Sequence, residues 1–266
     1  MRENNFNKVF FIFIGFSILI LIEGFFYFYS YKLSYYFDFF KIHKSGYNPL
    51  IWKENGIIET LQVFFLFFSI FNFIFILKKI KNINITLFTR VFVYVYLLGI
   101  IYFFFEEISW GQHIFGWETG SFFKSYNSQN ETNIHNISNV FNQLPRNILI
   151  VWCSTSFFLI KIFPKKSLKF FFLKKFIFPS HNLKNVSILL LFFFIPNFFV
   201  NIMGFHPGHG EYAQHIILSE ILDLITFNFI KLSEYHELIF TYYIFCHSNL
   251  YKRFLFLNEN EKGSKK

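Results

Sequence analysis

The sequence predicts an all-α fold: a polytopic membrane helix bundle of about six transmembrane helices, with the N and C termini both in the cytoplasm. Hydrophobic residues make up 54% of the 266 residues, and 47 of them are Phe. A soluble domain has no interior large enough to bury so many phenylalanines together with long apolar runs, so composition favours a membrane protein. Lys and Arg flank those runs, as is typical of topogenic charge.

The apolar runs divide the chain into six predicted spans, most of them close to the length that crosses a bilayer. They cover about residues 9–29, 57–77, 86–105, 147–163, 186–203 and 233–250. All belong to one predicted transmembrane domain, residues 1–255, followed by a disordered basic tail over residues 256–266. Pro196 is expected to kink the fifth span, and residues 212–229 are expected to form a further helix at the interface or against the bundle.

The basic residues predict the orientation of the bundle. With a cytoplasmic N-terminus, the connectors after the second and fourth spans and the C-terminal tail all lie inside, and these segments hold most of the Lys and Arg. This agrees with the positive-inside rule. The expected location is a bacterial inner (cytoplasmic) membrane crossed several times, with the lipid bilayer as the surrounding partner.

The charge and the cysteines exclude two other classes of protein. The net charge is +9, but no basic patch with interleaved stacking aromatics lies outside the apolar runs, so no nucleic-acid partner is expected. Cys153 and Cys246 fall in different predicted spans at different depths. A disulfide framework or a cysteine-based metal site is therefore not expected.

The most informative stretch is Phe103–Gly116, where an apolar run ends in two adjacent carboxylates, Glu106 and Glu107. Ionisable side chains at the end of a span are costly and often mark a functional site. Burial disfavours the charged form of a carboxylate, which suits a general base, and this is the catalytic role predicted for the pair. The alternative is structural: the pair bonds to Gln112, Asn side chains and backbone groups. If the helix continues past the apolar run, Glu106, Ser109, Trp110 and His113 share one face.

Other polar side chains converge on the outer side of the predicted topology. They predict an outward-facing polar pocket, roofed by the segments after the third and fifth spans, with these members: Glu23, Glu59, Gln62, Gln112, His113, Glu131 and His135. Two alternatives remain open. A carboxylate at the start of a span, such as Glu59, can reach the membrane surface, and Glu131 and His135 also fit an ordinary hydrophilic loop.

A second polar cluster follows the fifth span and predicts a metal site. Four side chains that can bind a metal fall within ten residues: His206, His209, Glu211 and His215. Imidazole and carboxylate ligands suit zinc or another divalent metal. The alternative is a Gly/Pro turn in which Glu211 complements a helix N-terminus and the histidines lie at a wet interface.

The Glu-Glu-Ile-Ser-Trp-Gly-Gln element at Glu106–Gln112, with Glu54–Glu59 and the polar run to Asn136, resembles an uncharacterised family of bacterial multi-pass membrane proteins. That resemblance implies no known activity, and it implies an arginine where this chain has His113. Glu106 and Glu107, with His135 and Asn139, are also faintly similar to the CaaX-protease-like intramembrane peptidases. Gly111 stands where that family has an arginine, and Phe205 and His209 follow His135 in the wrong order.

Two classes of function fit these observations. The first is an outward-facing membrane hydrolase, with or without a bound metal, that acts on a lipid-linked or peptide substrate, with Glu106 or Glu107 as its base. The second is a non-catalytic transporter, or a membrane assembly or structural protein, whose buried carboxylates carry protons or fix the structure. Carriers more often place ionisable residues at mid-membrane in broken helices, so the position of these residues at one membrane face favours the hydrolase.

The metal hypothesis predicts that the protein, purified in detergent, carries a near-stoichiometric divalent metal. Replacement of His206, His209 and His215 together by alanine removes three ligands and is expected to abolish binding, as elemental analysis of both proteins measures. Equal thermal stability and no metal in either protein would contradict the metal site.

Overall fold

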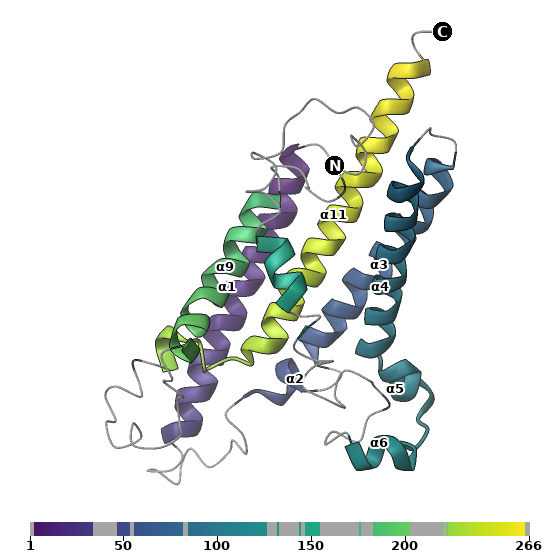
Figure 1. Ribbon diagram of the computed structural model, residues 1–266. Helices are drawn as coiled ribbons and strands as arrows, with labels where there is room; N and C mark the ends of the chain where they lie inside the picture. The colour runs from purple at the N-terminus through teal and green to yellow at the C-terminus, as the bar shows by residue number, and fades with distance from the viewer. Residues whose placement is uncertain are drawn as a thin grey trace. The chain divides into compact units, whose positions relative to one another are not determined.

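The computed structural model describes residues 3–33, 47–53, 56–81, 85–126, 132, 144, 147–154, 176, 183–202, 221 and 223–263. Every regular element among these residues is helical (Figure 1), in chain order α1 (Glu3–Leu33), α2 (Pro49–Trp52), α3 (Ile57–Ile80), α4 (Leu87–Glu107), a 3-10 turn at Ser109–Gly111, α5 (Gln112–Phe115), α6 (Ser121–Tyr126), α9 (Lys184–Ile202) and α11 (Leu232–Gly263).

Three stretches of the described chain are long and apolar enough to cross a membrane: Val9–Leu33, Pro49–Ile80 and Leu87–Glu107. A helix of 21 residues, such as α4, spans roughly 30 Å, the thickness of the hydrocarbon core. Helices satisfy their own backbone hydrogen bonds, which a bilayer requires. The prediction of an all-helical fold is thereby confirmed for the described residues, and the first three predicted spans coincide with helices long and apolar enough to cross a membrane.

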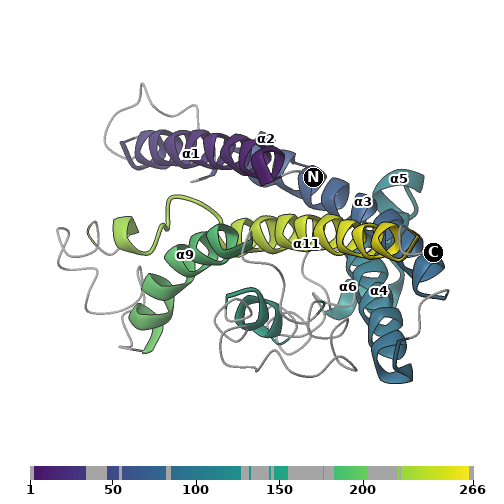
Figure 2. The same ribbon diagram turned by 90° about the horizontal axis from the view of Figure 1, so that it is seen from above.

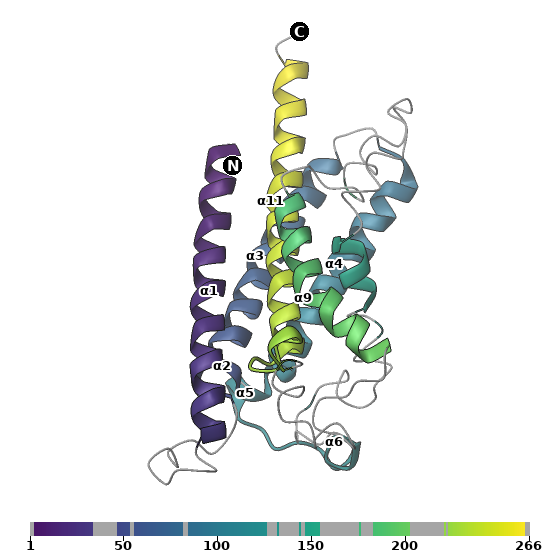
Figure 3. The same ribbon diagram turned by 90° about the vertical axis from the view of Figure 1, so that its left-hand side faces the viewer.

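The other three predicted spans are only partly described. Residues 147–154 are helical, and the remainder of the span predicted at 147–163 lies outside the described residues. The apolar part of α9, Lys184–Pro196, is shorter than a full span. α9 carries Pro196 in its interior, as the sequence predicted, and Figure 3 shows that this helix bends. α11 is continuous over the predicted sixth span but is not among the three membrane-length apolar stretches.

The described chain separates into two compact units, and each has its own packing. The first unit comprises Thr60–Ser187 and Phe240–Lys266, and it contains most of α3 and α11 and all of α4 to α6. The second comprises Arg2–Glu59 and Ile188–Ile239, and it contains α1, α2, most of α9 and the first turns of α11.

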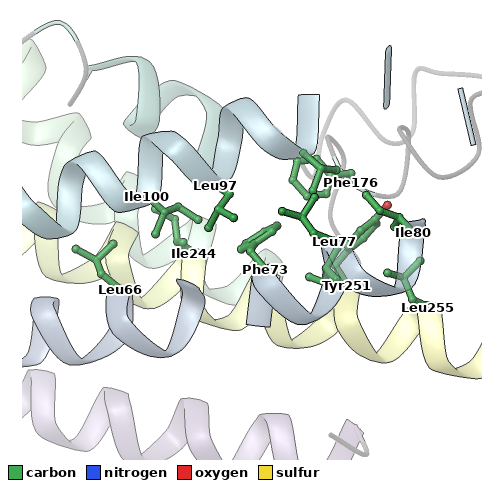
Figure 4. Close-up of a cluster of buried hydrophobic side chains, with 12 residues drawn as sticks. Leu66, Phe73, Leu77, Ile80, Leu97, Ile100, Phe176, Ile244, Tyr251 and Leu255 are labelled. Atoms are coloured by element: carbon green, nitrogen blue, oxygen red, sulfur yellow. The ribbon is translucent and has the colours of Figure 1, made fainter. Parts of the chain in front are cut away.

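In the first unit, α3 and α4 lie side by side with α11 along them (Figures 1 and 2). Their buried side chains form one cluster, shown in Figure 4, which also includes Phe176; its members are Leu66, Phe73, Ile76, Leu77, Ile80, Val93, Leu97, Ile100, Phe176, Ile244, Tyr251 and Leu255. A polar contact adds to this packing: the Asn72 Nδ2 donates to Ser248 Oγ at 3.1 Å, and Lys252 Nζ donates to Asn72 Oδ1 at 3.1 Å. Such hydrogen bonds between helices hold apolar bundles in register.

α11 extends beyond the point where the sequence predicts a disordered tail. The tail was predicted from residue 256, whereas the helix continues to Gly263. Leu255 is buried in the cluster of the first unit, and the residues after it include good helix formers such as Glu and Lys.

In the second unit, α1 packs against the turn that precedes α11. A Cβ atom added to Gly24 would lie 2.7 Å from Ile230 Cγ2 and 2.9 Å from the Phe229 carbonyl oxygen. Phe25 meets Phe229 edge to face at 5.8 Å. The small residue in α1 is therefore what allows the helix to approach the backbone of the turn.

The predicted helix over residues 212–229 does not extend to its expected end. Residues 203–220 and 222 lie outside the described part, and 226–229 form a turn. Phe227 has a left-handed backbone (φ 58°), and Asn228 bonds back to Asp223 through both its backbone and its side chain. Asn favours such local bonds over helix continuation.

Polar side chains fasten this turn to other parts of the second unit. Lys32 Nζ, in the last turn of α1, lies 2.7 Å from the Asp223 carboxylate. The Tyr47 hydroxyl donates to the Asn228 carbonyl at 3.0 Å. Burial, with a further contribution from the Asp223 carboxylate, raises the pKa of Tyr47. The hydroxyl therefore keeps its proton over a wider pH range and remains a donor.

We predict that Gly24→Ala destabilises the protein, because the new methyl group overlaps the backbone of the turn; overpacking of this kind costs about 1–3 kcal/mol. The matched control is Gly15→Ala in the same helix, where a Cβ meets nothing within 4 Å. Thermal unfolding in detergent measures both variants. Equal melting temperatures for the two would contradict this packing.

Candidate functional site

α4 ends at the carboxylate pair, and the chain then reverses in a tight turn. Ser109, Trp110 and Gly111 have φ angles of 45°, 56° and 95°. This backbone is easy for glycine but costs other residues about 1–3 kcal/mol each. A shared face for Glu106, Ser109, Trp110 and His113 required the helix to continue past the apolar run, and that condition is not met, because α4 ends at Glu107.

The reversal brings Trp110 back over the helix end. Its indole Nε1 donates to Glu106 Oε1 at 2.7 Å. Its ring stacks on Phe105, with 5.5 Å between centroids and 14° between planes. The Tyr102 hydroxyl, one helical turn before Glu106, also lies within hydrogen-bonding reach of the carboxylate. Glu106 is thus held by two aromatic side chains.

Both predicted catalytic carboxylates are buried: Glu106 is 2% exposed and Glu107 is 8% exposed. Burying a carboxylate is costly unless hydrogen bonds compensate the lost hydration. For Glu106 the indole and the phenol provide this compensation. The pair therefore combines two adjacent acids with little access to water, which is the setting in which carboxylates act as proton donors or acceptors.

Gln112, a predicted pocket residue, joins the segments that follow the turn. Its Nε2 donates to Thr119 Oγ1 at 2.7 Å, and its Oε1 accepts from the Thr132 backbone N–H at 2.7 Å. The Trp117 indole makes a longer contact of 3.4 Å with Thr132 Oγ1. The side-chain amide therefore supports the loop beyond the carboxylate pair.

The remaining predicted pocket residues belong to the first unit, belong to the second unit or lie outside the described part. Gln62, in α3 of the first unit, is fully buried. Glu59 and Glu23 belong to the second unit. Glu23 Oε1 accepts from Asn48 Nδ2 at 2.6 Å, and the Asn48 Oδ1 caps α2 by accepting from Leu50 N. The backbone of His113 belongs to α5, but its side chain is not described.

All four predicted metal ligands lie outside the described residues: His206, His209, Glu211 and His215. The same holds for Glu131 and His135. Within the described part of the chain, no group of three or more His, Cys, Asp and Glu side chains is placed to hold a metal ion. The metal site remains a prediction from the sequence.

Sequence reasoning missed several residues that complete this arrangement. Tyr102 lies four residues before Glu106 on α4, so helical spacing alone was sufficient to pair them. Thr119 and Thr132 carry no such signal, because neither shares a regular helix with Gln112. Asn48 was likewise not identifiable as the partner of Glu23, which lies 25 residues away.

Comparison with protein-family models, with curated proteins and with solved structures found no match for this chain. The chemistry of the site therefore has to be inferred from its own residues.

We predict that Trp110→Phe destabilises the protein by about 1–3 kcal/mol, because the ring still stacks on Phe105 while buried Glu106 loses its indole donor. Trp117→Phe is the matched control, since its indole contact is longer and more exposed. Melting temperatures in detergent, measured at one pH, compare the two. If the Trp117 variant loses as much stability as the Trp110 variant, the bond to Glu106 does not have this role.

Proposed function

We propose that this protein is a multi-pass enzyme of a bacterial inner membrane, a hydrolase whose base is supplied by the Glu106–Glu107 pair. The proposal includes six spans with both termini in the cytoplasm and the carboxylate pair at the outer membrane face. The observation that supports it is the burial of two adjacent carboxylates at the end of a membrane-length helix. A base that must take a proton from water works best where few other waters compete.

The two carboxylates differ in exposure, which suggests different roles. Glu106 accepts a 2.7 Å hydrogen bond from Trp110, and a fixed acceptor of this kind suits positioning. Glu107 is the next residue on the helix and is slightly more exposed. We assign to Glu107 the role of general base, which takes a proton from the attacking water, and to Glu106 the role of holding the turn in place.

The substrate class follows from the location of the pair. An acid pair at a membrane face meets substrates that lie in or on the bilayer, so a lipid-linked or peptide substrate is favoured. A divalent metal held by His206, His209, Glu211 and His215 is compatible with such a hydrolase. The role of Glu107 does not depend on it.

One observation favours the non-catalytic alternative, a transporter or a membrane assembly or structural protein. Glu106 is held by Trp110 and lies within reach of Tyr102, which is also how a purely structural carboxylate is compensated. In that case the pair fixes the end of α4 or carries a proton, and no bond is hydrolysed.

The experiment uses the full chain in vesicles made from a bacterial lipid extract, with a peptide library added and products identified by mass spectrometry. The unsubstituted protein and the control variant Glu118→Gln, whose side chain is 93% exposed, are expected to release products of water addition. Glu107→Gln is expected to lower the rate at least about 100-fold, because a positioned base contributes that much or more.

Two outcomes contradict the hydrolase. One is that product release by Glu107→Gln equals that of the control. The other is that the unsubstituted protein releases no product but moves protons across the vesicle membrane, and that Glu107→Gln abolishes this movement. The second result supports the transporter.

A further inference from the structure

Four large aromatic side chains are exposed on the segment that follows the end of α4 in the first unit. They are Trp110, Phe115, Trp117 and Phe122, with exposures of 41%, 77%, 41% and 59%, and together they are called the aromatic surface below. They lie on the 3-10 turn, on α5 and α6, and on the link between these two helices (Figure 1). From sequence, this segment was expected to be a polar roof over the pocket.

The aromatic surface continues the exposed apolar face of α4. Five exposed residues at helical spacing form that face: Val91, Val95, Leu98, Tyr102 and Phe105. On a helix of membrane length, such a face is turned to lipid. Trp110 stacks on Phe105 and meets Tyr102 edge to face at 6.3 Å. The lipid-facing surface of α4 therefore extends into the turn.

The indole N–H groups of both tryptophans have oxygen partners within the protein. The Trp110 N–H is bonded to Glu106, and the Trp117 N–H contacts Thr132 Oγ1. Phe115 lies parallel to Trp117, with 9° between the rings and 5.8 Å between centroids. The exposed part of these side chains is therefore ring surface, and its transfer out of water is favourable. An aromatic area of this kind in water is unusual without a partner.

Charged side chains accompany the aromatic surface. Lys124 Nζ lies 3.5 Å from the Glu118 carboxylate, and the two side chains are 50% and 93% exposed. Protein segments that lie at the boundary between lipid headgroups and acyl chains typically combine aromatic rings with solvated charged side chains.

We propose that the aromatic surface docks into this boundary layer of the bilayer, so that α5 and α6 lie on the membrane at the end of α4. The partner is the lipid surface itself. This inference is independent of the proposed hydrolase, because it concerns where the segment lies and not what Glu107 does.

The test places a nitroxide label on the full chain, at Phe115→Cys, at Phe122→Cys and at the control position Glu118→Cys, in vesicles of phosphatidylethanolamine and phosphatidylglycerol. The native Cys153 and Cys246 are buried, and labelling of the unsubstituted protein gives the blank. The measurement compares the collision rate of each label with oxygen, which concentrates in lipid, and with a water-soluble nickel chelate.

At positions 115 and 122 we expect oxygen collisions to exceed nickel collisions, with the order reversed at position 118. Two results overturn the proposal. If the labels at 115 and 122 are as accessible to nickel as the label at 118, the surface faces water. If they are shielded from both reagents, another protein surface covers them. Melting temperatures close to that of the unsubstituted protein confirm that the variants fold.

Discussion

The hydrogen bond from the Trp110 indole to the Glu106 carboxylate connects the main features of the described site. A buried carboxylate needs a donor, and the donor here comes from the residue four positions later. An α-helix does not supply it in this case, because α4 ends at Glu107 and the backbone of Ser109, Trp110 and Gly111 turns left-handed. That turn is strained, but it places the Trp110 indole where its N–H can donate to the Glu106 carboxylate.

The same turn relates the acid pair to the lipid. The Trp110 N–H donates to the buried Glu106, and the Trp110 ring stacks on Phe105 in the exposed face of α4. Trp110 therefore contacts both the buried carboxylate and the exposed apolar face of α4. That geometry is compatible with the proposed action on lipid-linked or peptide substrates.

The sequence predicted those features that follow from composition and local periodicity. The first three spans agree closely with α1, α3 and α4, because their long apolar runs carry no competing signal. The burial of Glu106 and Glu107 also follows from their place at the end of such a run. The condition for a single face from Glu106 to His113, a helix that continues past Glu107, is not met. The left-handed turn that follows depends on local backbone preferences that a helical wheel does not include.

Other features depend on contacts that are distant in sequence. Glu23 bonds to Asn48, and Gln112 bonds to Thr132. In neither pair do the two residues share a regular element, so a periodic pattern does not encode the contact. The close approach at Gly24 depends on Ile230 and the Phe229 backbone, about two hundred residues away. Glu106, Glu107 and Gln112 belong to one compact unit, and Glu23 and Glu59 belong to the other.

The burial of the carboxylate pair is the central claim, and differential carbodiimide labelling tests it most directly. The folded protein in vesicles is treated with a water-soluble carbodiimide, and its peptides are mapped by mass spectrometry, with the exposed Glu118 as the internal reference. The account predicts rapid modification of Glu118 and little or none of Glu106 and Glu107. Modification of all three at the same rate would show that the pair faces water and would contradict the account.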